Sequence, residues 1–207
     1  MGKRLPAATV CLVCLICAGV AHAVTFNGTD NPETIFATTR DDTVNARGGS
    51  DIVFGLSGDD TIRGGGGGDN IHGDATCPAN SRDPNACNQR RGTGDDEIQG
   101  NSGDDVIAGG NGDDRVIAGS GLDNVQGGNG KDRITGGSGN DIVLGQGGTD
   151  RITGGSGTDR LSGNSGNDRI SARDSARDRI NCGSGRDTAI VNRGDRVSRN
   201  CETVRRG

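Results

Sequence analysis

The sequence has no tryptophan and no tyrosine, and its 207 residues include only three phenylalanines and two histidines. Ordinary globular cores are built from large aliphatic and aromatic side chains. Here hydrophobic residues make up only 29% of the chain. The scarcity of histidine also leaves few candidates for a general base or for a zinc site. We therefore expect neither a conventional globular core nor an enzyme, and we predict no catalytic residues.

Long hydrophobic runs are absent except for residues 5–20. Lys3 and Arg4 precede this run, and Ala21-His22-Ala23 follows it with a small-x-small pattern. These features predict a secretory signal peptide over residues 1–23 and a secreted, extracellular protein. A membrane anchor is the alternative, but the run is short for a span. We expect no membrane span after cleavage and, in a chain of net charge −5, no nucleic-acid partner.

Cysteine is sparse once the predicted signal peptide is removed. The four cysteines that remain are Cys77, Cys87, Cys182 and Cys201. An even number in a secreted chain indicates disulfides, and the pairs nearest in sequence are Cys77–Cys87 and Cys182–Cys201. A zinc site is the alternative, but no Cys-x-x-Cys pair remains to form one.

Glycine, in contrast, is abundant, with 40 residues. Residues 91–171 form nine consecutive nonapeptides without a slip, for example 127–135, 136–144 and 145–153. Position 4 is glycine and position 6 is aspartate in all nine, and position 8 is a branched aliphatic residue. A fixed short period of this kind is typical of repeat solenoids.

These nonapeptides resemble the G-G-x-G-x-D-x-U-x repeats of the repeats-in-toxin (RTX), or hemolysin-type calcium-binding, family. The resemblance covers roughly residues 28–190 and implies a parallel β-roll with calcium ions held in its turns. Family members often carry these repeats beside an enzyme or toxin domain, and here no other domain remains to do chemistry. The predicted signal peptide departs from the C-terminal export signal that is usual in the family.

The spacing predicts how the repeats fold. Positions 7–9 form a short strand, so position 8 points inward while positions 7 and 9 point outward. Six residues of turn then lead to the opposite sheet, and two nonapeptides make one coil. Glycine at positions 2 and 4 permits positive φ and close backbone approach. The expected fold class is all-β, a right-handed parallel β-roll over residues 24–190.

Two segments interrupt the pattern. Residues 73–90 contain Pro78 and Pro84 and lack an aliphatic residue at position 8. They form either a disulfide-tied insertion loop or two decayed coils, and the prolines favour the loop. Residues 191–207 lose the repeat and are predicted to form a C-terminal cap, in which Val191, Val197 and Val204 lie over the open core. A cap protects an edge that would otherwise invite aggregation.

Stacking of coils places the position-6 aspartates in two rows. Carboxylates stacked in this way repel one another unless a cation lies between them. Aspartate oxygens and glycine-turn carbonyls form an all-oxygen shell that suits calcium better than magnesium, although a single such aspartate would more often cap a turn. We predict several Ca²⁺ ions, and exclude an EF-hand because glutamate is scarce. The predicted metal ligands are Asp51, Asp60, Asp69, Asp96, Asp105, Asp114, Asp123, Asp132, Asp141, Asp150, Asp159 and Asp168. Glu33, Asp42 and Asp178 lie in degenerate repeats and are left out.

Arginine recurs at position 7. Arg115, Arg133, Arg151 and Arg169 are spaced by 18 residues, so they form a row on one outer face. This row either makes that face soluble or contacts an anionic cell-surface polymer. Our leading hypothesis is a secreted, non-enzymatic calcium-binding repeat protein, expected to be a monomer, with calcium-dependent folding and a structural or surface role. The alternative is an extracellular adhesin or polymer-binding module that uses an outer sheet face.

Overall fold

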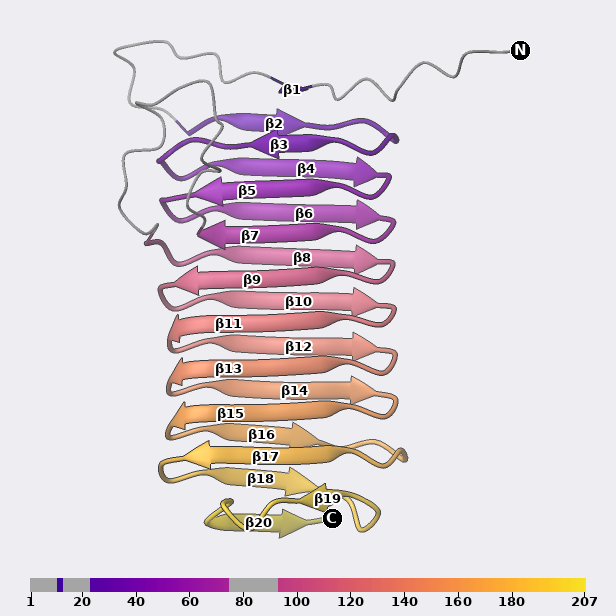
Figure 1. Cartoon of the computed structure of the whole chain (residues 1–207), viewed down its shortest axis with the longest axis vertical. Helices are drawn as coiled ribbons and strands as arrows, with labels where there is room; N and C mark the ends of the chain where they lie inside the picture. The colour runs from indigo at the N-terminus through magenta and orange to yellow at the C-terminus, as the bar shows by residue number, and fades with distance from the viewer. Residues whose placement is uncertain (1–10, 13–22, 75–92) are drawn as a thin grey trace, which may run out of the picture.

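The computed structural model describes residues 11–12, 23–74 and 93–207. Two parallel sheets of ten strands each face one another, and the chain alternates between them at every strand (Figure 1). No helix occurs in the described residues, so none there could span a membrane. The expected all-β, parallel solenoid is therefore confirmed.

The odd-numbered strands form one sheet, called the odd sheet here. They are β1 (Cys11–Leu12), β3 (Thr34–Phe36), β5 (Ile52–Leu56), β7 (Asn70–Asp74), β9 (Val106–Asn111), β11 (Asn124–Gly130), β13 (Ile142–Gly148), β15 (Arg160–Gly166), β17 (Arg179–Ser184) and β19 (Arg196–Val197). The even-numbered strands form the even sheet. They are β2 (Thr25–Asn27), β4 (Thr43–Gly48), β6 (Thr61–Gly66), β8 (Glu97–Ser102), β10 (Arg115–Ser120), β12 (Arg133–Ser138), β14 (Arg151–Ser156), β16 (Arg169–Ala172), β18 (Thr188–Val191) and β20 (Thr203–Arg206).

The strands are longer than the repeat pattern predicts. In β12, pairing continues from Arg133 at position 7 to Ser138 at position 3 of the next nonapeptide. Positions 8 and 1 are buried, whereas position 9 between them and position 2 after them are partly exposed. The inward–outward alternation therefore continues past position 9. The expectation of a three-residue strand is therefore wrong. Glycine at position 1 lies on the inner face without a side chain, which lets the strand continue toward the turn.

Positions 2 and 4 both have positive φ, but they differ in what they tolerate. Position 2 has positive φ with a side chain at Arg47, with φ of 81°, and at Gln146, with φ of 77°. The backbones of successive coils come equally close at both positions. An added Cβ would lie 1.8 Å from the carbonyl oxygen of Gly112 at Gly130 (position 4) and 1.9 Å from that of Gly110 at Gly128 (position 2). Every described residue with positive φ at position 4 is nevertheless glycine, so the exceptions are confined to position 2.

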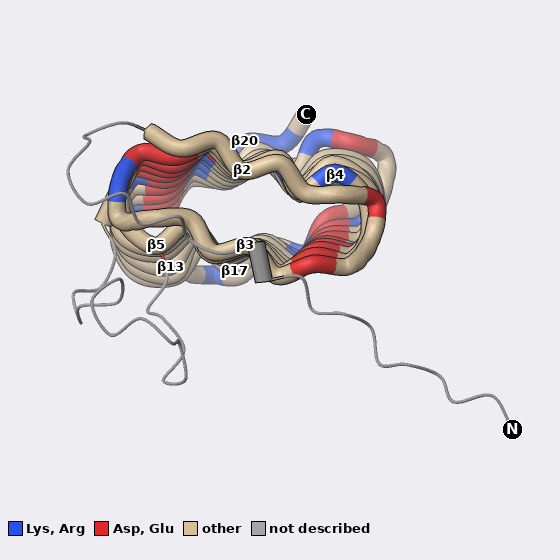
Figure 2. Tube along the Cα trace, turned by 90° about the horizontal axis from the view of Figure 1, so that it is seen from above, with Lys and Arg blue, Asp and Glu red and all other residues tan. Residues whose placement is uncertain are grey.

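The core is a thin layer of position-8 side chains between the sheets. Ile134 on β12 and Val143 on β13 are typical members, and both are buried. Figure 2, viewed along the stack, shows the flat oval cross-section that these two layers produce. Phe26 on β2, the first strand of the even sheet, covers one end of this layer and is only 6% exposed.

The strands on either side of the insertion pair directly with each other. β6 pairs with β8 and β7 pairs with β9, so the described coils before and after this segment stack directly on each other. Gly73 and Asp74, assigned to the insertion from the sequence, are the last two residues of β7. The predicted Cys77–Cys87 disulfide lies outside the described residues.

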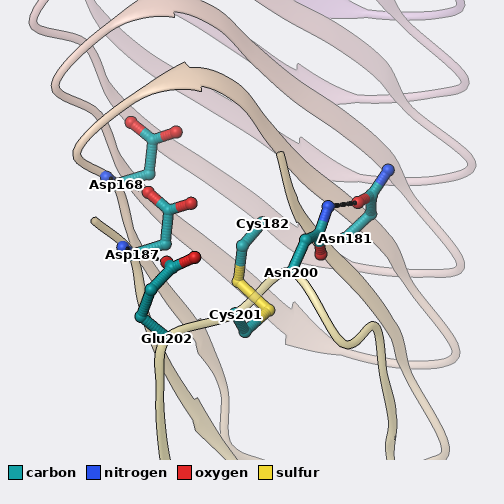
Figure 3. Close-up of a disulfide and its surroundings, with 7 residues drawn as sticks. All are labelled: Asp168, Asn181, Cys182, Asp187, Asn200, Cys201 and Glu202. Carbon is teal, nitrogen blue, oxygen red and sulfur yellow. Dashed lines mark hydrogen bonds between the residues drawn. A yellow bond between two sulfur atoms is a disulfide. The ribbon is translucent and has the colours of Figure 1, made fainter. Parts of the chain in front are cut away.

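The C-terminal tail continues both sheets. β19 pairs with β17 and β20 pairs with β18, and the predicted Cys182–Cys201 disulfide is present (Figure 3). Val191 is buried and Val197 packs against the core, as expected. Val204 was expected to cover the core, but it is 40% exposed. It occupies the inward position of β20, the last strand of the even sheet, and no further coil covers it there.

Candidate metal centre

The position-6 aspartates lie in two rows at opposite turns of the oval, visible as two red stacks in Figure 2. Each of these aspartates is the residue immediately before a strand. The first Asp row precedes the even strands and consists of Asp42, Asp60, Asp96, Asp114, Asp132, Asp150, Asp168 and Asp187. The second Asp row precedes the odd strands and consists of Asp51, Asp69, Asp105, Asp123, Asp141, Asp159, Asp178 and Asp195. Every predicted metal ligand falls in one of these rows.

One oxygen of each carboxylate ties neighbouring coils together. Within each row, Oδ1 of an aspartate accepts a hydrogen bond from the backbone N–H of the row member one coil earlier, at 2.7–3.1 Å. The first Asp row ends at Glu202, whose Oε2 accepts from the Asp187 N–H at 2.8 Å. Figure 3 shows Asp168, Asp187 and Glu202 stacked in this order. The cap therefore continues the row with a different acidic residue.

The other oxygen of each predicted ligand has no hydrogen-bond donor, whereas at the row ends Oδ2 of Asp42 accepts from Thr38 and Oδ2 of Asp195 accepts from the Asn192 N–H. Every predicted ligand is at most 2% exposed, and its Oδ2 is buried with no partner among the described residues. In the repeats that begin with glycine, this oxygen points toward that glycine at position 1. A Cβ on Gly127, for example, would lie 2.3 Å from Oδ2 of Asp132. A buried acceptor without a donor is costly, so this arrangement calls for a ligand that supplies positive charge.

Burial raises the pKa values of these aspartates above the ordinary 3.8. Burial is the largest cause at Asp60 and Asp114, and the charges of their row neighbours add to it. The Oδ1 hydrogen bond opposes the shift, yet the pKa of each reaches about 8. In the second row the same balance raises the pKa of Asp105 and Asp159 to about 7. Near neutral pH, ionising these groups without a counter-ion therefore opposes folding.

The available ligands favour a hard cation. Within the described residues, no group of three or more His, Cys, Asp or Glu side chains converges on one point. An ion in these turns must therefore take most of its ligands from backbone carbonyls, together with the free Oδ2 atoms. His72 lies apart from the turns on the outer face, where its ring stacks on Phe54 with centroids 5.3 Å apart. An all-oxygen shell with flexible geometry suits Ca²⁺.

Asp74, which is not among the predicted ligands, adds a carboxylate to the edge of the first Asp row. Its Oδ2 accepts from the Asn111 N–H at 2.9 Å, and its Oδ1 is buried without a partner. Its charge contributes to the raised pKa of Asp60, Asp96 and Asp114. Asp74 occupies position 2, where the repeat has no aspartate, so no periodic pattern indicates it.

A second set of acidic residues was also overlooked. Position-5 aspartates stack beside the first Asp row, and each accepts a backbone hydrogen bond from the next coil. The Asp95 N–H donates to Asp59 Oδ1 at 3.0 Å, and the Lys131 N–H donates to Asp113 Oδ1 at 2.8 Å. The 18-residue spacing that identified the position-6 rows was visible here as well. These position-5 side chains are exposed, and their hydrogen bonds join the turns of adjacent coils.

Two comparisons bear on this geometry. The family model of the RTX calcium-binding nonapeptide repeat matches residues 27–62, 48–75, 91–125, 117–152, 144–176 and 153–189. A comparison with curated proteins finds no match. The matched segments include every residue predicted to bind metal.

Proposed function

The chain belongs to the family of RTX calcium-binding nonapeptide repeats, and we propose that it is a secreted protein whose folding depends on calcium bound along both Asp rows. The observation that carries this proposal is the series of buried Oδ2 atoms without donors. The ions would be held by Oδ2 of Asp51, Asp60, Asp69, Asp96, Asp105, Asp114, Asp123, Asp132, Asp141, Asp150, Asp159 and Asp168, with turn carbonyls completing each shell.

Calcium dependence follows from the energetics of the rows. Neighbouring carboxylates in a row are buried and repel each other, and the thin aliphatic core is small for a chain of this length. Calcium removes the repulsion and contributes its binding free energy to folding, because the unfolded chain has no preformed site. Calcium is scarce in the cytoplasm and plentiful outside, so the chain folds after export. Extracellular sites of this kind work at calcium concentrations of ~0.1–1 mM.

The extracellular role rests on the predicted signal peptide over residues 1–23 and on the Cys182–Cys201 disulfide, which is typical of an oxidising compartment. The repeats occupy nearly all of the described chain, and their position-6 and position-8 side chains are used for turns and core. This allocation supports a structural or surface role for a non-enzymatic monomer.

The test is a calcium titration of residues 24–207, prepared without calcium. Circular dichroism follows folding while isothermal titration calorimetry counts the ions. We expect a cooperative gain of β structure with calcium, little gain with the same concentration of magnesium, and reversal by a chelator. A chain that is equally compact and cooperative in excess chelator would contradict the proposal.

A second candidate function is a polymer-binding module, because exposed arginines align on an outer face. In the even sheet, register pairs Arg115 with Arg133, Arg133 with Arg151 and Arg151 with Arg169. Arg115 forms an ion pair with Glu97 at 2.6 Å, which partly neutralises this row. The odd sheet carries arginines in register as well, and there they lie beside a groove.

A further inference from the structure

A groove of about 590 Å³ crosses the outer face of the odd sheet near its C-terminal end. It runs over β13, β15, β17 and β19, across the direction of the strands. Arg160, Arg179 and Arg196 lie along it, one from each of the last three strands, and Ile142 and Leu144 lie at its β13 end. We call these five residues the arginine groove.

The three arginines form a regular row. Register pairs Arg160 with Arg179 and Arg179 with Arg196, so successive guanidinium groups start from backbone positions about 4.8 Å apart. All three side chains are exposed. The only ion pair among the described residues joins Arg115 and Glu97 on the other sheet, so none of these three arginines forms an ion pair with a described carboxylate. Three like charges at this spacing favour an anionic ligand with a matching repeat.

The remainder of the groove adds two kinds of contact. Ile142 is exposed and lies next to Arg160 in the sheet, and Leu144 is half-buried two residues further along β13. These side chains offer an apolar surface at one end. Asn181 on β17 lies in the lining as well, and its Oδ1 is held by the Asn200 side chain at 2.7 Å (Figure 3). The lining therefore combines charge, an apolar surface and a positioned amide.

We propose that the arginine groove binds a linear acidic polysaccharide that carries one carboxylate on each sugar. Such a chain advances on the order of 5 Å per sugar, as single bonds of about 1.5 Å across one ring and one bridging oxygen imply. This repeat matches the arginine row one-to-one when the glycosidic torsions of the bound chain turn successive carboxylates to the same side. Guanidinium groups bind carboxylates through two parallel hydrogen bonds. The C–H faces of the rings pack on Ile142 and Leu144, and Asn181 contacts hydroxyl groups.

Other polyanions fit the groove less well. An extended acidic peptide presents side chains of one face every ~6.7 Å, twice the rise per residue, which does not match successive arginines. Single-stranded nucleic acids bind on aromatic platforms, and no aromatic side chain lines this groove. The chain as a whole has a net charge of −5, which disfavours long-range attraction of nucleic acid.

The experiment measures binding of a short oligomer of galacturonic acid to residues 24–207 in saturating calcium. Calorimetry gives the affinity, and circular dichroism confirms in every sample that the protein stays folded. The variant is Arg160→Gln, Arg179→Gln and Arg196→Gln together. The matched control changes Arg47, Arg63 and Arg186 to Gln, which removes the same charge from exposed positions that lie outside both arginine rows.

We expect the groove variant to lose about tenfold or more in affinity and the control to stay within about threefold of the unmodified protein. Equal losses in both variants, or a larger loss in the control, would overturn the assignment to this groove. Tighter binding of poly-glutamate or single-stranded DNA than of the uronate oligomer would overturn the choice of ligand. Absent binding in a protein that still folds with calcium would overturn this inference while leaving the calcium proposal intact.

Discussion

Oδ1 of Asp132 accepts a 2.9 Å hydrogen bond from the backbone N–H of Asp114, 18 residues earlier, while its Oδ2 is buried and has no hydrogen-bond partner. One carboxylate thus has two uses. One oxygen fixes the stacking of successive coils, and the other remains available to a cation. Because every predicted ligand repeats this arrangement, coil stacking and ion binding depend on the same side chains.

Replacing Asp114 by Asn separates these two uses. The amide keeps an acceptor for the Asp96 N–H but removes the negative charge from the buried site. With calcium we expect a loss of stability of about 1–3 kcal/mol and a higher calcium midpoint, because a charged ligand is lost. Without calcium we expect equal or greater stability, because a buried charge disappears. Denaturant unfolding at zero and saturating calcium measures both signs.

The control for this change is the adjacent residue. Asp113→Asn removes the same charge one position earlier in the same turn, where the side chain is exposed and its Oδ1 receives the Lys131 N–H. It should leave the calcium midpoint nearly unchanged. If Asp113→Asn and Asp114→Asn shift the midpoint equally, net charge rather than the buried oxygen governs calcium binding.

The raised pKa values predict how stability depends on pH without calcium. Burial and neighbouring charges raise the pKa of Asp60 and Asp114 to about 8 from 3.8. The folded chain therefore binds protons more tightly than the unfolded chain, so its stability is greatest below about pH 4 and falls as pH rises toward 8. Thermal unfolding in chelator from pH 4 to pH 8 should show a falling midpoint. Saturating calcium should flatten or reverse this slope, since the ion replaces the protons, and an unchanged slope would contradict a metal role for these carboxylates.

The sequence predicts the period, the two sheets and the alignment of both Asp rows because each depends only on spacing. An 18-residue coil places Asp132 next to Asp114 whatever the details of the turn. Spacing also predicts the arginine row that passes through Arg133 and Arg151, which the strand register confirms.

Other features depend on contacts that spacing does not contain. Residues 172–181 form a repeat that is one residue longer than the others. Asp178 lies within this repeat and Asp187 lies after it, and only their hydrogen bonds, which span 19 residues, show that they continue their rows. Arg196 lies in the tail, where no repeat is recognisable, yet β19 pairs with β17 and brings it into line with Arg179. The groove beside this row runs over four strands, and one of them, β19, lies outside the recognisable repeats.

The insertion gives a prediction about chain length. Asp74 is at position 2 and Gly94 is at position 4, so removing residues 75–92 joins Asp74 to Thr93 and restores one complete nonapeptide. Because β6 already pairs with β8, and β7 with β9, no strand has to move. We expect the shortened chain to fold with calcium and to bind the same number of ions, as measured by circular dichroism and calorimetry. Failure to fold, or fewer bound ions, would show that the removed segment supports the adjoining coils.

The cap can be tested through its disulfide. Cys182 is buried at position 1 of its repeat and is bonded to Cys201. Other repeats have a buried alanine at this position, Ala118 and Ala172, so the substitution Cys182→Ala introduces a side chain that fits there. Removing both cysteines, with Cys201→Ala, should cost roughly 3 kcal/mol, as expected for a loop with a sequence separation of 19.

The loss should be local, because each coil of a solenoid contacts only its neighbours. Hydrogen exchange of the calcium-loaded variant should therefore speed up in β19 and β20 first, then in β17 and β18, and remain unchanged in the coils around β10 and β12. The unmodified protein under the same conditions is the control. Acceleration spread evenly along the stack would mean that the coils unfold as one unit, and that the cap stabilises the entire solenoid rather than its end.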